Sequence, residues 1–379
     1  MTVQRLLGLV AGLPLLWLVA QPVGAQNVQV NPGAGDYPTL KAAFDAINLG
    51  THTGAITVAV SADTTETLPA VLNASGSGGA LYTSISITPT GGAARTISGA
   101  IAAGSPLIDL NGADNVTIDG LNTGGNSLTI ANTTVSPTSV TSTIRFIGGA
   151  TNNLITNSNI QGSGTMSVAT NGATIFFSTD ALTANGNDNN TISNNNIGPA
   201  GANLPTKGIL CNGSASTTAI GNSGNIVNNN NIFDYFGAAV TSAGIATNGG
   251  CNTWTISNNR FYQTATRTWT TGALHAGINI QNTTGTSGAQ GFTITGNTIG
   301  FASNTQTGTY TLTGVGTGAK FLGILFNGIV TGTTSQHQQQ HGRRRQPDRG
   351  HRRGHDNSKS VHGDAVSGRQ YHQQRQHHW

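Results

Sequence analysis

The stretch Ile192-Ser-Asn-Asn-Asn-Ile197 decides the fold expected of this 379-residue chain, because it recurs. In each copy an aliphatic residue is followed by a small polar residue, by one or more Asn, and by a second apolar residue. Full copies begin at Ile155, Val227, Ile256 and Ile294, and a degenerate copy begins at Val116. Counted from Ile118, the steps between the copies are 37, 37, 35, 29 and 38 residues.

A second short strand pattern alternates with the first. It is centred on Ile144, Ile175, Ile209, Ile245, Ile278 and Ile324, with steps of 31, 34, 36, 33 and 46 residues. Two separate motifs that keep a similar irregular period indicate a solenoid, in which each repeat buries its apolar stripe only by stacking on its neighbours.

The repeat chemistry favours a β-solenoid over a helical one. Apolar and small polar residues alternate at period two, most clearly in Thr191–Ser193 and residues 292–295. Asn and Gly follow each strand, and both tolerate the positive φ of a tight turn. We expect the Asn of stacked turns to bond the backbone of the next coil and to form a ladder.

One amphipathic helix precedes the repeats. Leu40, Ala43, Phe44 and Ile47 fall at i, i+3, i+4 and i+7, and Thr39 is a possible N-cap. Gly50 is expected to terminate the helix. We expect this helix to cover the open end of the solenoid, whose strand edges would otherwise recruit other chains.

These residues resemble a known group. GAGDYPTLKAAFDAIN (33–48), NVTIDGLN (115–122) and the Asn-rich coils are similar to the pectin-lyase-like superfamily, and more narrowly to Gly/Thr/Asn-rich repeats of large secreted bacterial surface proteins. The resemblance implies an all-β chain that forms a right-handed parallel β-helix with an N-terminal capping helix. This scaffold hosts lyases, hydrolases, esterases and non-catalytic binders, so fold alone assigns no activity.

Composition supports this interpretation. The chain is 36% hydrophobic but only 8% charged, with 53 Gly, which excludes a disordered polyelectrolyte and a coiled coil. The overall net charge of +4 comes from the C-terminal tail: residues 26–334 hold seven Lys/Arg and ten Asp/Glu, which gives 7 − 10 = −3. With the tail discounted, nothing favours a nucleic-acid partner.

The domain organisation follows from these segments. Residues 1–25 have the polar start, apolar run and Val23-Gly24-Ala25 site of a secretory signal peptide. Residues 26–50 form the N-terminal cap, and residues 51–334 form the repeats. No other stretch has the length of a membrane span, so we expect a secreted or cell-surface protein.

Residues 335–379 form a His/Gln/Arg-rich tail. Read one base later, Gln codons followed by C encode Asn or Ser, and His codons encode Ile or Thr. Residues 335–345 can then be read as Ala-Asn-Ile-Asn-Asn-Asn-Thr-Val-Ala-Ala-Val, which is the repeat pattern. We interpret the tail as an out-of-frame translation of further repeats; the alternative is a genuine low-complexity tail that binds metal or polyanions.

The two cysteines, Cys211 and Cys251, are too few for a disulfide scaffold. They could pair if neighbouring coils bring them together, or they could be two unrelated buried thiols.

Catalytic candidates are sparse, and we assign no catalytic residue. The resemblance implies that a lyase would need carboxylate-bound calcium and a basic side chain, and that a hydrolase would need clustered Asp. Asp109, Asp114 and Asp119 lie within eleven residues, and Asp180 and Asp188 flank a loop that could hold calcium or could simply be solvated. Arg145 precedes that loop, and His275 stands alone. Apart from calcium, no cofactor is expected.

A binding strip is the other candidate. The segments Asp234-Tyr235-Phe236 and Arg260-Phe261-Tyr262, followed by Arg267 and Trp269, place aromatic rings and guanidinium groups one coil apart. We predict that Tyr235, Arg260, Tyr262, Arg267 and Trp269 bind a polysaccharide or cell-surface glycan, with Tyr262 and Trp269 exposed and with Phe236 and Phe261 in the core. The favoured function is non-catalytic adhesion or glycan binding, and the alternative is a polysaccharide lyase or glycoside hydrolase acting on acidic glycans.

Overall fold

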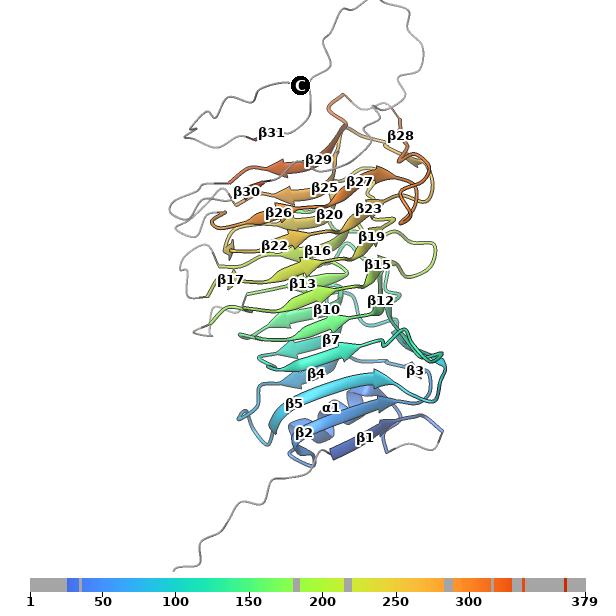
Figure 1. Ribbon diagram of the computed structural model, residues 1–379, viewed down its shortest axis with the longest axis vertical. Helices are drawn as coiled ribbons and strands as arrows, with labels where there is room; N and C mark the ends of the chain where they lie inside the picture. Colours follow the sequence, from blue (N-terminus) through green and yellow to red (C-terminus); the bar gives the residue numbers. More distant parts are fainter. Residues whose placement is uncertain are drawn as a thin grey trace, which may run out of the picture.

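Three long parallel sheets, named A, B and C, form the body of the molecule, and each coil of the chain adds one strand to each sheet in that order. The computed structural model describes residues 26–33, 36–179, 185–214, 220–282, 289–314 and 317–328, and the backbone of 336–337 and 365–366. The coils stack into an elongated column with α1 (Leu40–Asn48) at one end (Figure 1).

Within the described residues, eight complete coils run from β2–β3–β4 to β26–β27–β29. Sheet A contains β1 (Gln26–Val30), β2 (Thr53–Val60), β5 (Leu81–Pro89), β8 (Val116–Asp119), β11 (Leu154–Thr156), β14 (Thr191–Ser193), β18 (Ile226–Asn228), β22 (Thr255–Ser257), β26 (Thr293–Thr295) and β30 (Gln336–His337). Sheet B contains β3 (Thr64–Thr65), β6 (Ala94–Gly99), β9 (Ser127–Asn132), β12 (Ser158–Gly162), β15 (Asn196–Pro199), β19 (Asn231–Phe233), β23 (Arg260–Tyr262) and β27 (Thr298–Phe301).

Sheet C completes each coil, and two short ribbons lie beside the column. Sheet C contains β4 (Ala70–Asn73), β7 (Pro106–Asn111), β10 (Ser142–Ile147), β13 (Ile175–Phe177), β16 (Lys207–Cys211), β20 (Ser242–Thr247), β25 (Leu274–Ile280), β29 (Lys320–Phe326) and β31 (Ala365–Val366). The ribbons are β17 (Asn222–Ser223) with β21 (Cys251–Asn252), and β24 (Arg267–Thr268) with β28 (Leu312–Thr313). The expected all-β parallel β-helix with one short N-terminal helix is therefore confirmed.

The inward-facing residues of each sheet form columns in register. In sheet A, Ile118 pairs with Ile155, Ile155 with Ile192, and the column continues through Val227 to Ile256. These side chains are fully buried. Burying an Ile side chain stabilises the folded chain by about 2–3 kcal/mol. Each aliphatic side chain of the column is covered only by the neighbouring coils, so a single coil could not bury it and stacking is obligatory.

The expected Asn ladder is also confirmed. Asn195, Asn230, Asn259 and Asn297 occupy one position of the corner between sheets A and B, and each side-chain oxygen accepts the backbone N–H of the residue one coil earlier at 2.9–3.0 Å. The residue before each of them has a positive φ, 57° at Asn194 and 56° at Asn229. The Asn-rich repeat therefore supplies both the turn conformation and the bond between coils.

The N-terminal helix lies at the end of the column, as expected. Thr39 accepts the Ala42 N–H at 3.1 Å as N-cap. The carboxylate of Glu66, which is 1% exposed, accepts the N–H groups of Leu40 and Lys41 at 2.9 and 3.1 Å. A carboxylate at this position satisfies helix N–H groups and stabilises the positive end of the helix dipole.

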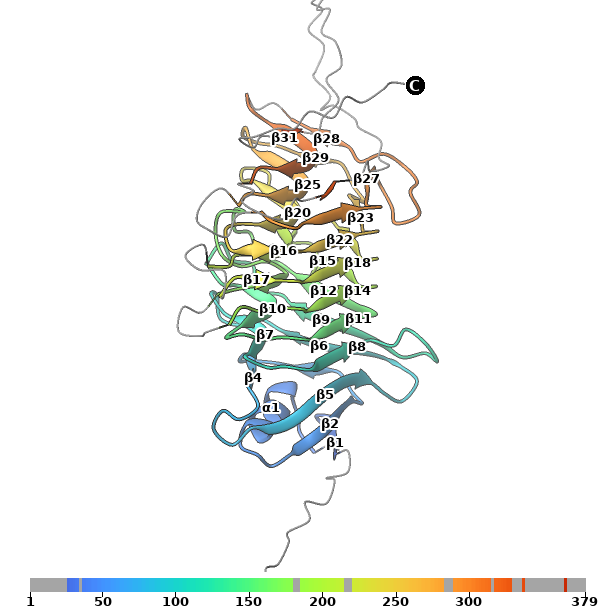
Figure 2. The same cartoon turned by 60° about the vertical axis from the view of Figure 1, so that its left-hand side comes forward.

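Loops are distributed unevenly around the column. From β11 to β27, the A–B corner has one or two residues between strands, as between Thr156 and Ser158. The longer connections lie at the other two corners and project sideways (Figure 2). One of them, residues 163–174, lies against the outer face of sheet C, where Val168 packs on Phe176 and Leu210. We call this segment the strap.

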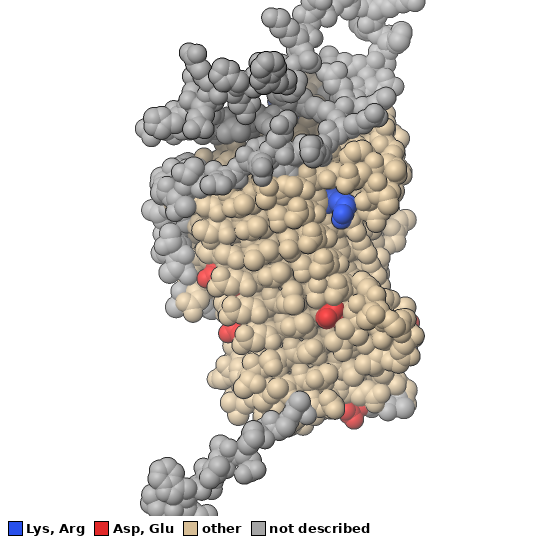
Figure 3. Space-filling view, viewed as in Figure 1, with Lys and Arg blue, Asp and Glu red and all other residues tan. Residues whose placement is uncertain are grey.

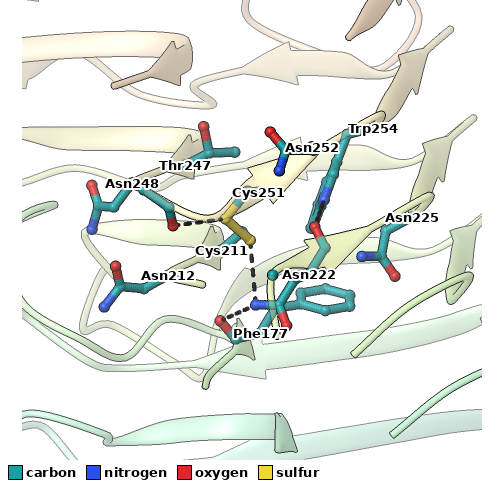
Figure 4. Close-up of a disulfide and its surroundings, with 12 residues drawn as sticks. Phe177, Cys211, Asn212, Asn222, Asn225, Thr247, Asn248, Cys251, Asn252 and Trp254 are labelled. Atoms are coloured by element: carbon teal, nitrogen blue, oxygen red, sulfur yellow. Dashed lines mark hydrogen bonds between the residues drawn. A yellow bond between two sulfur atoms is a disulfide. The ribbon is translucent and has the colours of Figure 1, made fainter. Parts of the chain in front are cut away.

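A disulfide joins Cys211 at the end of β16 to Cys251 in β21, with their Cα atoms 6.3 Å apart. Of the two alternatives left open by the sequence, the paired one is therefore observed. Beside the disulfide, the Trp254 indole N–H donates to the Asn222 carbonyl oxygen at 2.9 Å and the ring meets Phe177 edge-on (Figure 4). The disulfide fixes the C–A corners of consecutive coils against the core.

The described residues include little of three features predicted from the sequence: the signal peptide, the domain boundaries and the C-terminal tail. The signal peptide, residues 1–25, lies outside them, and the predicted domain boundaries stay predictions. Within the tail, β30 continues sheet A and places His337 beside Ile294, while β31 continues sheet C. The out-of-frame reading puts Ile at position 337, which is the residue that the sheet A column has in most coils.

Candidate functional site

From β11 to β27 the A–B corner has no loop longer than two residues, so the outer surface around it is not interrupted by loops of that corner. We call it the loop-free face; it spans the five coils that begin with β11, β14, β18, β22 and β26. On sheet A it presents two columns of side chains in register, neither of which contains a charge. The first is Leu154, Thr191, Ile226, Thr255 and Thr293, and the second is Thr156, Ser193, Asn228, Ser257 and Thr295. The view of Figure 3, which has these strands at the front, is almost entirely uncharged.

Sheet B continues this face with an amide column and an aromatic column. Asn196 donates to Asn159 at 2.9 Å and Asn231 donates to Asn196 at 2.8 Å, and Arg260 follows in the same column. The aromatic column is Phe233, Tyr262 and Phe301.

Two rings of the aromatic column stack face to face. The Phe233 and Tyr262 rings are 5.2 Å apart between centroids and 7° from parallel. The Phe233 ring lies over Gly198, where a Cβ would approach it to 2.6 Å. Glycine at that position therefore leaves room for the Phe233 ring.

The predicted aromatic and guanidinium strip is only partly assembled. Tyr262 and Trp269 were expected to be exposed, but they are 8% and 2% exposed, and that expectation is wrong. Trp269 packs with Phe236 and Leu312 beneath the loops of the B–C corner. Tyr235 is fully buried. Phe236 and Phe261 are buried, as expected.

The two arginines of that strip have different surroundings. Arg267 donates to Asp234 at 2.6 Å and to Gln263 at 2.7 Å, so its charge is neutralised within the loop. Arg260 is half-exposed on the loop-free face, and no ion pair joins it to an acidic residue of the described chain. The structure thus brings Arg260 and Tyr262 together with Phe233, whereas Tyr235, Arg267 and Trp269 hold the neighbouring loop.

His275 was expected to stand alone, but it lies in a buried polar network. Its Nδ1 is 2.7 Å from the Ser242 hydroxyl and its Nε2 is 2.5 Å from the Tyr310 hydroxyl. Burial, together with the charge of Arg267, lowers the pKa of His275 to about 3, so the ring is neutral. Ser242 and His275 are both fully buried, which removes this pair from any substrate.

Each catalytic candidate carboxylate of the earlier coils already has a structural partner. Asp109 forms a two-pronged ion pair with Arg145, at 2.9 and 2.6 Å, on the outer face of sheet C. Asp114 accepts the Thr151 N–H and hydroxyl at 2.6 and 2.7 Å. Asp119 accepts the Leu121 N–H at 2.8 Å. These carboxylates therefore accept hydrogen bonds from turn residues or pair with an arginine. Arg145 is held in its ion pair with Asp109 and is not available as a free base.

The predicted calcium site is only half placed, because Asp180 lies outside the described residues. Asp188 accepts the Ser223 N–H at 2.5 Å, and burial raises the pKa of its carboxyl. Within the described chain no three His, Cys, Asp or Glu side chains converge as metal ligands. Calcium binding stays a prediction.

Sequence reasoning missed Lys207, which the strap buries completely. Its ammonium donates to the carbonyl oxygens of Ser167 and Thr170 at 2.6 and 2.5 Å. Burial lowers the pKa of Lys207 to about 7. The sequence signal is a lysine at the start of a strand whose other residues all read as buried.

Phe233 was also missed as a candidate site residue, although the repeat itself points to it. It occupies the position after the inward Ile232, as Tyr262 does after Phe261 in the next coil. Alignment of the copies therefore predicts the Phe233–Tyr262 pair.

A small crevice at the B–C corner is lined by residues that include Asn132, Thr143 and Gly162 and leaves about 0 Å³ of space for a water-sized molecule. It is therefore far smaller than the ~300–1,000 Å³ of typical small-molecule sites. In the described part of the chain, no helix is long and apolar enough to cross a bilayer.

No family model matches this sequence, and neither does any curated protein. Among solved structures the chain is similar to PfbA, a surface adhesin of Streptococcus pneumoniae, at 15% identity and a TM-score of 0.40, covering 78% of this chain and 75% of that chain. It is similar to an alginate lyase from Paenibacillus sp. str. FPU-7 at 16% identity and a TM-score of 0.39, covering 81% and 99%. A pectin methylesterase from Aspergillus niger aligns at 12% identity and a TM-score of 0.32, covering 79% and 88%. The neighbours include an adhesin and enzymes, so this likeness does not choose between adhesion and catalysis.

Proposed function

We propose that this protein is an exported, non-catalytic β-helix that binds a polysaccharide through its loop-free face. The observation that carries the proposal is the half-exposed Phe233 ring, which stacks on the buried Tyr262 ring, beside Arg260, which forms no ion pair within the described chain. Aromatic faces pack on the C–H faces of sugar rings, and a guanidinium group donates to ring and hydroxyl oxygens. A parallel stack on a rigid sheet offers this contact without a cost in side-chain ordering.

The engaged carboxylates support a binding role over a catalytic one. General acid–base catalysis requires a carboxyl or basic group that can reach the substrate and exchange a proton with it. The carboxylates of Asp109, Asp114 and Asp119 are instead committed to Arg145, Thr151 and Leu121.

Export is supported by two independent features. Residues 1–25 have the pattern of a cleaved secretory leader. The Cys211–Cys251 disulfide fits an oxidising compartment, because thiols are kept reduced in the cytosol. We therefore place the protein outside the cell or on the cell surface.

The proposal is tested by binding to a panel of immobilised polysaccharides. Phe233→Ala and Arg260→Ala should each weaken binding about tenfold, equivalent to 1.4 kcal/mol. Arg95→Ala is the matched control, because Arg95 is a half-buried arginine of β6, below the loop-free face. Equal binding by wild type and both face variants would exclude this site.

A further inference from the structure

The columns of the loop-free face run along the axis of the solenoid without interruption. The first column of sheet A pairs Thr191 with Ile226, Ile226 with Thr255, and Thr255 with Thr293. Adjacent parallel strands lie about 4.8 Å apart, so five coils extend this pattern over about 20 Å. The pattern therefore repeats along one direction only.

Loops limit the face in the other direction. The A–B corner is at most two residues long in these coils, whereas the longer connections lie at the C–A and B–C corners and border the two sheets. A long rigid ligand that crosses the column would meet these loops. A ligand that lies parallel to the axis would not.

The chemistry of the face points to an uncharged ligand. Hydroxyl and amide groups alternate with the carbon surfaces of Leu154 and Ile226, and Arg260 is the charged residue among the described columns. A polyanion would therefore find one cationic partner, Arg260, among the described columns, and none along the rest of the face. Sugars without charge offer the same mixture of hydroxyl groups and C–H surface.

Two acceptors at the A–B corner lack a donor. The Oδ1 atoms of Asn228 and Asn231 are buried and make no hydrogen bond, although both side chains are only half-buried. An unsatisfied buried acceptor costs about 1–3 kcal/mol. Because both atoms are buried, a ligand hydroxyl could reach them only after these amide side chains rotate.

We infer that the ligand is a linear, neutral polysaccharide that lies parallel to the solenoid axis and places successive sugars on successive coils. This inference rests on the proposed function and names the ligand class of the same face. Affinity then grows with ligand length, because each added sugar meets a further coil.

The test measures binding of neutral linear oligomers of glucose, xylose, mannose and N-acetylglucosamine, from disaccharide to hexasaccharide, by calorimetry. At least one neutral series should bind several-fold tighter with each added sugar up to the tetrasaccharide. An oligogalacturonate series of the same lengths, which carries carboxylates, should bind more weakly and show no greater gain with length.

A charge placed within the columns provides the matched variant. Thr255→Glu introduces a carboxylate in the fourth of the five coils, which also contains Arg260, and should reduce hexasaccharide affinity at least tenfold. Ser86→Glu, in the same sheet A column but in β5 below the loop-free face, should leave hexasaccharide affinity unchanged. Thr255→Arg repeats the test with the opposite charge, and far-UV circular dichroism checks that each variant is folded.

The outcomes separate the two proposals. If neutral oligomers bind with an affinity that does not depend on length, or if oligogalacturonate binds more tightly, the inference is overturned while glycan binding stands. If no neutral or acidic polysaccharide binds at all, the proposed function itself fails.

Discussion

The side-chain oxygen of Asn230 accepts the backbone N–H of Asn195, one coil earlier, at 2.9 Å, while its amide donates to the Ile192 carbonyl oxygen at 2.8 Å. Asn230 is fully buried. One side chain therefore satisfies two main-chain groups of the neighbouring coil, at a corner where the chain turns within two residues. The same relationship recurs along the column and makes the coil interface specific as well as apolar.

Replacing Asn230 should destabilise the solenoid strongly. In Asn230→Ala both the Asn195 N–H and the Ile192 carbonyl oxygen lose their partner, and each unsatisfied group costs about 1–3 kcal/mol. We expect a loss of about 3 kcal/mol in the free energy of unfolding, measured by urea denaturation. Asn231→Ala, at the next residue, is the control. The Asn231 amide makes one hydrogen bond, to the Asn196 side chain on the outer surface, and we expect its loss to lower the free energy of unfolding by less than about 1 kcal/mol. Equal losses in both variants would contradict the ladder's role.

Reducing the disulfide should lower the stability of the same region. The bond closes a separation of 40 residues, for which the loop-closure relation gives about 4 kcal/mol. The thermal midpoint should therefore fall when reductant is added. The double variant Cys211→Ala/Cys251→Ala should melt near the reduced wild type and should not respond to reductant. A wild-type midpoint that is indifferent to reductant would show that the bond does not restrain the fold.

Lys207 should make stability depend on pH at the alkaline side of neutrality. Burial lowers its pKa from 10.5 to about 7, so above pH 7 the unfolded chain binds more protons than the folded chain. Between the folded pKa of about 7 and the unfolded value of 10.5, the free energy of unfolding therefore increases with pH. As the pH falls toward 7, the buried amine becomes protonated and this gain in stability disappears.

This dependence is measured as the difference between wild type and Lys207→Met in urea midpoints from pH 7 to about 9, below the range in which tyrosines ionise. The wild type should gain stability relative to the variant as the pH rises. Lys320→Met, at an exposed lysine, should run parallel to wild type. Parallel curves for wild type and Lys207→Met would mean that the ammonium is solvated and that the strap does not bury it.

The reading frame after Thr334 gives a separate prediction. β30 places His337 in register with Ile294, and the sequence read one base later has Ile at that position. Resequencing of the coding DNA should find a shifted frame. Protein made from the corrected frame should gain an Asn-ladder coil and a higher thermal midpoint than the present chain. A clean frame in the DNA would show that the His/Gln/Arg tail is genuine.

The architecture could be predicted from sequence because local and long-range signals agree. The Ile192-Ser-Asn-Asn-Asn-Ile197 repeat specifies, in the same few residues, an inward aliphatic, a positive-φ turn and the ladder Asn. The capping helix could be predicted for the same reason, from an apolar period of 3.6 and a Thr N-cap. The contribution of Glu66 to that cap could not, because the carboxylate lies about one coil away in sequence.

The candidate site was harder to predict because exposure is decided by loops of irregular length. Trp269 and Tyr235 have the composition of a sugar-binding strip, yet the B–C loops fold over both of them. His275 has no sequence neighbour that announces Ser242 or Tyr310, which are 33 and 35 residues away. Only the strands that keep the repeat register, such as those with Phe233 and Tyr262, could have been placed by alignment of the copies.

Binding without turnover is the central claim, and one measurement tests it most directly. The protein, prepared from the corrected reading frame, is incubated with each polysaccharide of a neutral and acidic panel, with and without calcium, and retained protein and released soluble sugar are quantified in the same tube. The account predicts retention on at least one neutral polysaccharide, no increase of reducing ends or unsaturated products over buffer, and no effect of calcium. Calcium-dependent release of products from an acidic polysaccharide would contradict it.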